Sequence, residues 1–242
     1  MAIHQTIRHN NMQSIPILWP FALNAVLLQQ KNVTYNIMLK IAEKSRRHFN
    51  DIAACYDDSY DGKFCSQAYG ELKREVEEFT TGKWLDVSCG PGTLLSLMSH
   101  SPLQKYGVDF SEKMIEEARC NVGEDTELFV ASADNMPFEH DTFDVVTCSF
   151  AFHHYLNPSL VLKELYRVMK SGATLIIADP YLSQPGRSII NPLLRFSNNG
   201  DYHMYGRKEL GRLMRNNGFL TDSFWRINKH TFICRSLAVK LR

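Results

Sequence analysis

The sequence predicts an α/β fold: a mostly parallel sheet wound on both faces with helices and ending in an antiparallel hairpin. After Gly82, short apolar segments alternate with amphipathic helical segments, and such alternation requires right-handed crossovers between parallel strands. Only a short link separates the last two apolar segments, as in an antiparallel hairpin. The length of 242 residues suits one domain of ordinary size with an extension.

Two amphipathic helices are expected ahead of the sheet, because apolar residues recur at helical spacing from 37 to 54 and from 64 to 79. Tyr56, Asp57, Asp58 and Tyr60 lie between them and are expected to form a loop. We assign residues 37–80 to lid helices of a domain spanning 37–242, and residues 1–36 to an N-terminal extension.

Seven strands are expected, at residues 84–87, 106–110, 127–131, 143–150, 174–178, 219–225 and 231–239. Helices should follow Gly92 and Ser111, with Ser111 as the cap of residues 112–119. Asn157 followed by Pro158 is typical of a cap and a first helical position. A helix at 207–217 should end at Gly218. The long segment 181–205 is expected to be an insertion that faces the substrate.

Composition excludes several classes of protein. Lys and Arg number 27 against 26 Asp and Glu, so the net charge of +1 lacks the positive excess typical of nucleic-acid binders. The six cysteines form no CxxC pair, which favours reduced thiols in a cytoplasmic protein, and no metal site is expected. No apolar run is long enough for a membrane span, and Leu23 and Ala25 give only half of a secretory cleavage signature.

The strongest functional motif is Leu-Asp-Val-Ser-Cys-Gly-Pro-Gly-Thr at residues 85–93, where the first strand turns into a helix. Glycines at such a turn let a ligand approach the backbone, so a nucleotide-like ligand is expected at this sheet edge. A dinucleotide fingerprint starting at Gly90 would need a third glycine where Leu95 stands. Asp86, placed ahead of the turn, suits a ligand that carries an ammonium group.

Two further acidic positions follow successive strands. Asp109 ends the second strand, where a carboxylate can accept hydrogen bonds from both ribose hydroxyls of an adenosine. Asp134 and Asn135 follow the third strand, where they can contact an adenine edge. A loop carboxylate alone is often only a cap or turn former, but three acids at three strand ends favour a common ligand.

These motifs resemble the class I S-adenosylmethionine-dependent methyltransferases, and the small-molecule branch with the ubiquinone and menaquinone methyltransferases in particular. The resemblance covers about residues 49–219. It implies a Rossmann-like doubly wound sheet of seven strands, S-adenosylmethionine as the cofactor, and methyl transfer to a small acceptor. Quinone-like or other aromatic molecules are the first candidates for that acceptor. The stretches that carry it are 86–93, 108–114, 133–144, 149–158 and 164–179.

The resemblance also implies roles for individual residues. The matched positions are Asp86, Gly90 and Gly92 in the loop that holds the methionine portion, Asp109 at the ribose, Phe110 and Met114 beside the adenine, Asp134 and Asn135 at its edge, Ser149 and Phe150 beside the methyl group, and Tyr56 in a lid over the cofactor. One departure is Ser88, which stands where the family has its first glycine. It is expected to keep the extended backbone of a strand end and to narrow the cavity.

The chemistry needs little from the protein beyond alignment, because a sulfonium loses its positive charge as it gives up the methyl group. A base is needed only for a protonated hydroxyl or an acidic carbon. His154 is the first candidate and His153 the second, since imidazole titrates near neutral pH. The alternative is that either histidine only binds nearby backbone.

Other functions remain open at this point. The chain could be a methyltransferase-like binding module without activity, a nicotinamide-dependent oxidoreductase, or an RNA methyltransferase, although no RNA-binding platform is visible. Within the insertion, polar and aromatic side chains could bind an acceptor: Arg187, Arg195, Tyr202, His203 and Tyr205. Cys89 is expected to be a small packing residue.

Overall fold

The computed structural model describes residues 39–194, 196–197 and 199–240. The chain divides into two units, Met1–Lys40 and Ile41–Arg242, and only residues 39 and 40 of the first are described, both helical. The expected extension 1–36 and the first two residues of the expected lid therefore lie outside the described residues. The second unit carries all the features that follow.

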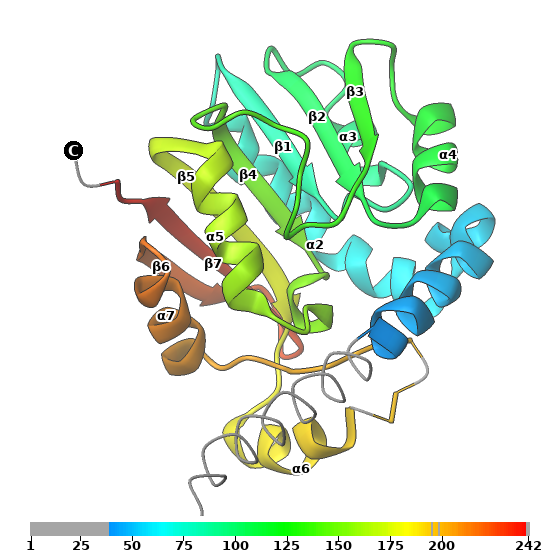
Figure 1. Ribbon diagram of the computed structural model, residues 1–242, viewed down its shortest axis with the longest axis vertical. Coiled ribbons are helices and arrows are strands. Elements are labelled where there is room, and N and C mark those ends of the chain that lie inside the picture. The colour runs from blue at the N-terminus through cyan, green and yellow to red at the C-terminus, as the bar shows by residue number, and fades with distance from the viewer. Residues whose placement is uncertain (1–38, 195, 198, 241–242) are drawn as a thin grey trace, which may run out of the picture. The chain divides into compact units, whose positions relative to one another are not determined.

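A seven-stranded sheet with the order β3-β2-β1-β4-β5-β7-β6 forms the centre of this unit (Figure 1). The first five strands of this order, β3, β2, β1, β4 and β5, pair in parallel. Strand β7 runs antiparallel to both β5 and β6. The strands are β1 Lys83–Val87, β2 Gln104–Asp109, β3 Thr126–Val130, β4 Phe143–Ser149, β5 Met169–Pro180, β6 Phe219–Arg226 and β7 Thr231–Ala238. The predicted fold class and terminal hairpin are confirmed.

Helices connect the parallel strands as expected: α3 Thr93–Leu97, α4 Glu112–Asn121, α5 Pro158–Val168 and α7 Arg207–Asn216. Ser111 caps α4, because its Oγ accepts a hydrogen bond from Met114 N at 3.1 Å. Asn157 caps α5 through Leu160 N at 3.3 Å, with Pro158 as the first helical residue. The capping chemistry therefore fixes where each helix begins.

The core lies on both faces of the sheet, because side chains alternate along each strand. Trp84 and Ile176 pack on one face with apolar residues of α2, α3 and α4, whereas Leu85 and Leu175 pack on the other with α5 and α7. This alternation makes the fold doubly wound. Within the described residues, no helix combines the length and apolar character of a membrane span.

The front of the unit differs from the expected pattern of two helices joined by a loop. Residues 41–52 are helical, but η1 Ala53–Asp58 is a 3₁₀ helix and α2 Tyr60–Glu77 begins directly after it. The loop prediction for 56–60 is wrong, because Ser59 Oγ accepts from Gly62 N at 3.1 Å and starts α2 earlier. A Cβ on Gly62 would lie 2.1 Å from the Tyr56 carbonyl oxygen, so this glycine allows α2 to pack on η1.

The insertion at 181–205 contains a helix that the sequence did not indicate. Helix α6 spans Gln184–Leu194 and precedes the connection to α7 (Figure 1). Gly186 and Pro192 lie within it, and both residues are usually read as helix breakers. The helix forms despite both residues, so local propensity alone did not indicate it.

Candidate functional site

The sheet order places the site at the carboxyl ends of β1 and β4. The chain proceeds from β1 to β2 and β3 on one side, whereas β4 pairs with β1 on the other. Neighbouring crossovers leave β1 in opposite directions, and the crevice between them is where open α/β sheets bind ligands. The loop after β1 and the ends of β2 and β4 meet at this edge.

The loop after β1 contains three left-handed residues: Ser88 with φ of 56°, Gly90 with 55° and Gly92 with 76°. The expectation that Ser88 keeps an extended backbone is therefore wrong. A left-handed serine costs about 1–2 kcal/mol, which a glycine would avoid. The Ser88 Oγ lies 2.9 Å from the Tyr155 hydroxyl, and this hydrogen bond helps to hold the strained residue.

The two loop glycines differ in what surrounds them. A Cβ on Gly90 would meet only Met114 Sδ, at 4.0 Å, so the space above Gly90 is open to a ligand. A Cβ on Gly92 would lie 2.8 Å from Val122 Cγ1 and 3.2 Å from Ala118 Cβ. Gly92 thus permits close packing of the loop against α4, whereas Gly90 leaves room beside Met114.

Asp86 is buried in β1 beneath this loop, with 1% of its surface exposed. Its Oδ1 accepts a hydrogen bond from the Thr147 hydroxyl at 2.6 Å. Its Oδ2 is buried and receives no hydrogen bond from any described residue. Burial raises the pKa of this carboxyl to about 7, although the Thr147 hydrogen bond opposes the shift. A cationic donor at Oδ2 would give the buried oxygen a partner and stabilise the ionised carboxylate.

Asp109, at the end of β2, ties the loop to its neighbouring strand. Its Oδ2 accepts from Gly90 N at 2.9 Å and its Oδ1 from Ser111 N at 2.8 Å. Burial raises its pKa against these two hydrogen bonds. Phe110 is exposed next to it, and buried Met114 reaches the loop at Gly90. Gly90, Asp109, Phe110 and Met114 therefore lie at the same edge of the sheet, and their contacts with a cofactor remain a prediction.

Asp134 and Asn135 lie beyond the end of β3 with exposed side chains. The Ser132 hydroxyl donates to Asp134 Oδ1 at 2.6 Å, and Asn135 N donates to the Ser132 carbonyl oxygen at 3.0 Å. These contacts form a local turn, so the predicted adenine contact remains a prediction.

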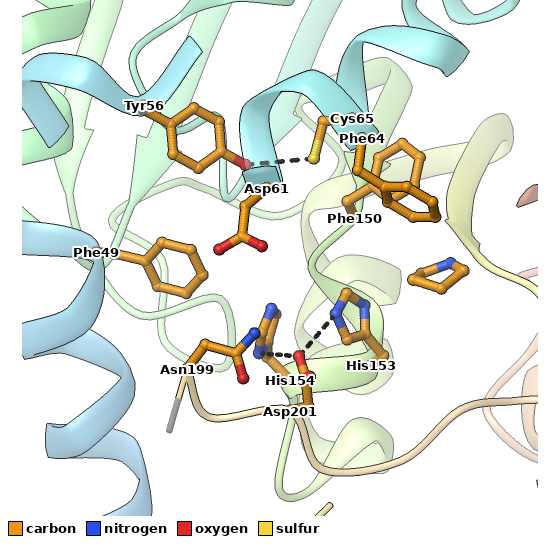
Figure 2. A pocket seen from close by; sticks show the side chains of 11 residues that line it. Phe49, Tyr56, Asp61, Phe64, Cys65, Phe150, His153, His154, Asn199 and Asp201 are labelled. Carbon is orange, nitrogen blue, oxygen red and sulfur yellow. Dashed lines mark hydrogen bonds and ion pairs between the residues drawn. The ribbon is translucent and has the colours of Figure 1, made fainter. Parts of the chain in front are cut away.

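A small cavity lies beside the end of β4, between the front helices and the insertion (Figure 2). Its volume is about 50 Å³. Phe150 lines it, and half-buried Ser149 precedes Phe150 in the chain. The lining residues are Phe49, Tyr56, Asp61, Phe64, Cys65, Phe150, His153, His154, Pro180, Asn199 and Asp201.

The front helices supply the aromatic wall of this cavity. Phe49 packs edge-on against His154 with ring centroids 5.3 Å apart, and Phe64 packs likewise on Phe150 at 5.4 Å. The Tyr56 hydroxyl lies 3.2 Å from Cys65 Sγ (Figure 2). Tyr56 therefore lines the cavity, while its hydroxyl contacts Cys65 of α2, and its role in a lid remains a prediction.

His153 is held between two carboxylates. Its Nδ1 lies 2.8 Å from Asp179 Oδ1, and its Nε2 lies 3.3 Å from Asp201 Oδ1. Burial opposes protonation of His153, but the two carboxylates outweigh it and raise the pKa to about 10. Burial raises the pKa of Asp179 as well, against the attraction of the His153 imidazolium. His153 is therefore a cation at neutral pH.

His154 has the opposite character. Burial and the neighbouring His153 charge lower its pKa to about 3, so its imidazole is neutral. Its Nδ1 lies 3.6 Å from Asp201 Oδ1 and makes no hydrogen bond to a described residue. Its other nitrogen, Nε2, is directed away from Asp201 on the cavity side (Figure 2). Of the two predicted base candidates, His154 is thus the one with a free lone pair.

Sequence reasoning missed three polar residues around the histidines: Asp179, Asn199 and Asp201. No local pattern links Asp201 to His153, because the contact depends on the fold of the insertion. Of the side chains suggested for acceptor binding, none of the described ones lines this cavity. Arg187 donates to the Leu182 carbonyl oxygen, His203 pairs with Glu209, Tyr202 does not line the cavity, Tyr205 is buried against Phe152, and Arg195 lies outside the described residues.

Cys89 is buried among apolar side chains on the α2 face of the sheet, as expected for a packing residue. Burial raises the pKa of its thiol well above the usual value. It is therefore a protonated thiol rather than a nucleophile.

Comparison with known proteins relates this geometry to a family. Residues 85–177 match the family model described as a methyltransferase domain. The chain is 35% identical over 136 residues to the ubiquinone/menaquinone biosynthesis C-methyltransferase UbiE of Desulfotalea psychrophila, covering 55% of this chain and 52% of that protein. It is 38% identical over 108 residues to the demethylmenaquinone methyltransferase of Clavibacter sepedonicus, covering 44% of each. The chain thus matches about half the length of these curated relatives.

Solved structures share the fold at low sequence identity. The YcgJ protein of Bacillus subtilis superimposes with a TM-score of 0.63 at 17% identity, over 73% of this chain and 100% of that one. A SAM-dependent methyltransferase of Aquifex aeolicus gives a TM-score of 0.57 at 21% identity, over 71% and 89%. The resemblance inferred from the motifs is confirmed for this part of the chain: residues 85–177 match a methyltransferase domain, and the curated relatives that match the chain are named as methyltransferases.

Proposed function

We propose that this protein transfers a methyl group from S-adenosylmethionine to a small aromatic acceptor that carries an acidic hydroxyl. The observation that carries the proposal is the buried, unpartnered Oδ2 of Asp86, in the strand that leads into the loop where Gly90 has open space beside it. A buried carboxylate without a donor is costly, and the cofactor's ammonium group is a donor of matching charge. The chain therefore has both the need and the room for such a ligand.

The remaining cofactor contacts follow the sheet edge. Asp109 would accept from the ribose hydroxyls, with Phe110 and Met114 beside the adenine and Asp134 and Asn135 at its edge. Ser149 and Phe150 would border the sulfonium, next to the cavity that Phe150 lines. When bound, the cofactor supplies an electrophilic methyl group on sulfur. The protein has to align that methyl group with the acceptor and exclude water.

The cavity supports an aromatic acceptor, because Phe49, Tyr56, Phe64 and Phe150 supply flat apolar walls. The names of the relatives, which specify quinone-type substrates, point the same way. The present volume of about 50 Å³ is smaller than the ~150 Å³ that accommodates a benzene ring. The segment that carries Phe49 and Tyr56 would therefore move to admit the acceptor and close afterwards.

His154 is proposed as the base. With the proton on Nδ1 facing Asp201, its Nε2 lone pair is available to an acceptor hydroxyl in the cavity. Loss of the hydroxyl proton raises the electron density of the ring or oxygen that attacks the methyl group. The Asp201 carboxylate would then stabilise the imidazolium, as an orienting acid does for a catalytic histidine. The cationic His153 is less suited to accept a proton.

The test is transfer of an isotope-labelled methyl group from S-adenosylmethionine to a soluble hydroquinone and to a matched arene without hydroxyl groups. We expect transfer only to the hydroquinone, and a fall in kcat of about 100-fold in His154→Gln. His203→Gln is the control, because His203 pairs with Glu209 outside the cavity. Saturable cofactor binding without transfer to any hydroxylated arene would favour an inactive binding module instead.

A further inference from the structure

Three side chains from two separate segments bring their donor atoms together at the cavity wall: His153, His154 and Asp201. Asp201 Oδ1 lies 3.3 Å from His153 Nε2 and 3.6 Å from His154 Nδ1, and the three donor atoms are all within 4.8 Å of one another. Two ligand atoms at 2.0–2.2 Å from one tetrahedral ion lie about 3.4 Å apart. The separations to Asp201 are close to that value.

The outer contacts of this cluster are those of a metal centre. His153 Nδ1 lies 2.8 Å from the buried carboxylate of Asp179, which fixes the ring and directs Nε2 toward Asp201. A carboxylate behind the non-ligating nitrogen of a histidine is the usual second partner in zinc sites. His154 Nδ1 is buried and makes no hydrogen bond to a described residue, so it has an unused donor atom directed at the same point.

The charges within the cluster also favour a divalent cation. Two carboxylates, Asp179 and Asp201, lie beside the two histidine rings, with nitrogen-to-oxygen distances of 2.8, 3.3 and 3.6 Å. An excess negative charge in a buried cluster is unfavourable unless it is compensated. Metal ligation requires both imidazoles to be neutral, so a divalent ion would balance the two carboxylates, and any proton on a ligating nitrogen would be released to solvent.

We propose that His153 Nε2, His154 Nδ1 and Asp201 bind one divalent transition-metal ion, with zinc as the best match to two imidazoles and one carboxylate. The adjoining cavity leaves a fourth coordination position for water or an oxygen ligand. This site does not rest on the proposed methyl transfer. The two roles of His154 belong to different forms of the protein: with the ion on Nδ1, the proton of His154 lies on Nε2, so the ion would inhibit the proposed transfer and the metal-free form would catalyse it.

The experiment is a titration of the full-length, untagged and metal-free protein with Co²⁺, followed by visible absorption. We expect one equivalent to bind and to give the d–d bands of a four- or five-coordinate ion. Sulfur-to-cobalt charge-transfer absorption in the near ultraviolet should be absent, since no cysteine belongs to the cluster. Zn²⁺ should displace the cobalt and raise the Tm of the wild-type protein by mass action.

Asp201→Asn and His154→Gln should each weaken Co²⁺ binding at least about tenfold. His203→Gln is the matched control, because it removes a histidine that faces a carboxylate at 2.8 Å in the same segment, and it should bind within twofold of the wild type. Circular dichroism identifies any variant that fails to fold. If one of the two ligand variants fails, the cobalt affinity of the other tests the metal site. Uptake that does not saturate, cobalt–thiolate absorption, or wild-type affinity in a folded variant would overturn the metal site.

Discussion

The hydroxyl of Thr147 donates a hydrogen bond of 2.6 Å to Asp86 Oδ1 and in turn accepts one of 2.9 Å from the Trp84 indole. This chain across β1 and β4 fixes one oxygen of the carboxyl and leaves Oδ2 unpartnered among the described residues. The proposed cofactor contact follows from that arrangement, because the fixed carboxyl presents its second oxygen in a set direction.

Cofactor affinity should rise with pH in the range where Asp86 ionises. Its pKa in the free protein is raised from 3.8 to about 7, so below neutrality the carboxyl is protonated and cannot pair with an ammonium group. We expect S-adenosylhomocysteine to bind about tenfold more weakly at pH 5.5 than at pH 7. Calorimetry at the two pH values measures this. Asp86→Asn should bind weakly at both, and a wild-type affinity that stays flat would contradict the assignment.

The same shift affects the stability of the free protein. Because the folded pKa of Asp86 lies above its usual value of 3.8, the folded state binds the proton more tightly than the unfolded state. The carboxyl therefore stabilises the fold only while it is protonated, and this contribution is lost as pH rises from about 4 to 7. Urea unfolding of the wild type and of Asp86→Asn should be compared across this range. The difference between their unfolding free energies should depend on pH and disappear near pH 4.

Substitutions of three left-handed glycines should distinguish a loss of stability caused by backbone strain from a loss of cofactor affinity caused by a blocked ligand site. Gly90→Ala and Gly172→Ala both place alanine at positive φ without a close contact, so each should cost about 1–2 kcal/mol in unfolding free energy. Only Gly90→Ala should weaken binding of S-adenosylhomocysteine. Gly92→Ala should destabilise more than either, since its Cβ meets Val122 at 2.8 Å. Equal cofactor affinity in the first two variants would place the ligand elsewhere.

Ser88 and Tyr155 should be energetically coupled. Their hydroxyls lie 2.9 Å apart, and Ser88 has a φ of 56°. Tyr155→Phe should destabilise the wild type by about 1 kcal/mol but have little effect in a Ser88→Gly background, where the partner is absent. A double-mutant cycle by urea denaturation gives the coupling energy. A value near zero would show that the hydrogen bond does not hold the left-handed serine.

The buried pair of His153 and Asp179 should contribute strongly to the fold. Asp179→Asn leaves the imidazolium of His153 buried with only Asp201 as its carboxylate, and we expect a loss of about 3–5 kcal/mol in unfolding free energy. Glu209→Gln breaks the more exposed pair with His203 and should cost less than about 1 kcal/mol. Similar losses of unfolding free energy in the two variants would show that the buried pair of His153 and Asp179 stabilises the fold no more than the exposed pair of His203 and Glu209.

Much of the fold could be predicted from local chemistry. Ser111 and Asn157 cap their helices as expected because a cap depends only on neighbouring backbone groups. The strands were evident because both faces of the parallel sheet are covered, which makes the central strands rich in apolar residues. The acid at Asp109 was found because it ends one of these strands.

What the sequence could not predict depends on contacts between distant segments. The left-handed Ser88 makes a hydrogen bond to Tyr155, 67 positions away in the sequence, and helix α6 forms despite Gly186 and Pro192. The partnership of His153 with Asp201 needs the insertion to fold back over β4. The sequence therefore named only part of the cavity lining, whereas the strand-end residues that it named lie along one edge of the sheet and their roles at a cofactor remain predictions.

The central claim is that the edge formed by β1, β2 and β4 binds S-adenosylmethionine, and calorimetric titration with S-adenosylhomocysteine tests it most directly. We expect saturable one-to-one binding, no binding of NAD, and at least about tenfold weaker binding in Asp109→Asn, whose neutral amide accepts weaker hydrogen bonds from the ribose. Absence of binding by folded wild-type protein, or saturable binding of NAD alone, would contradict the account.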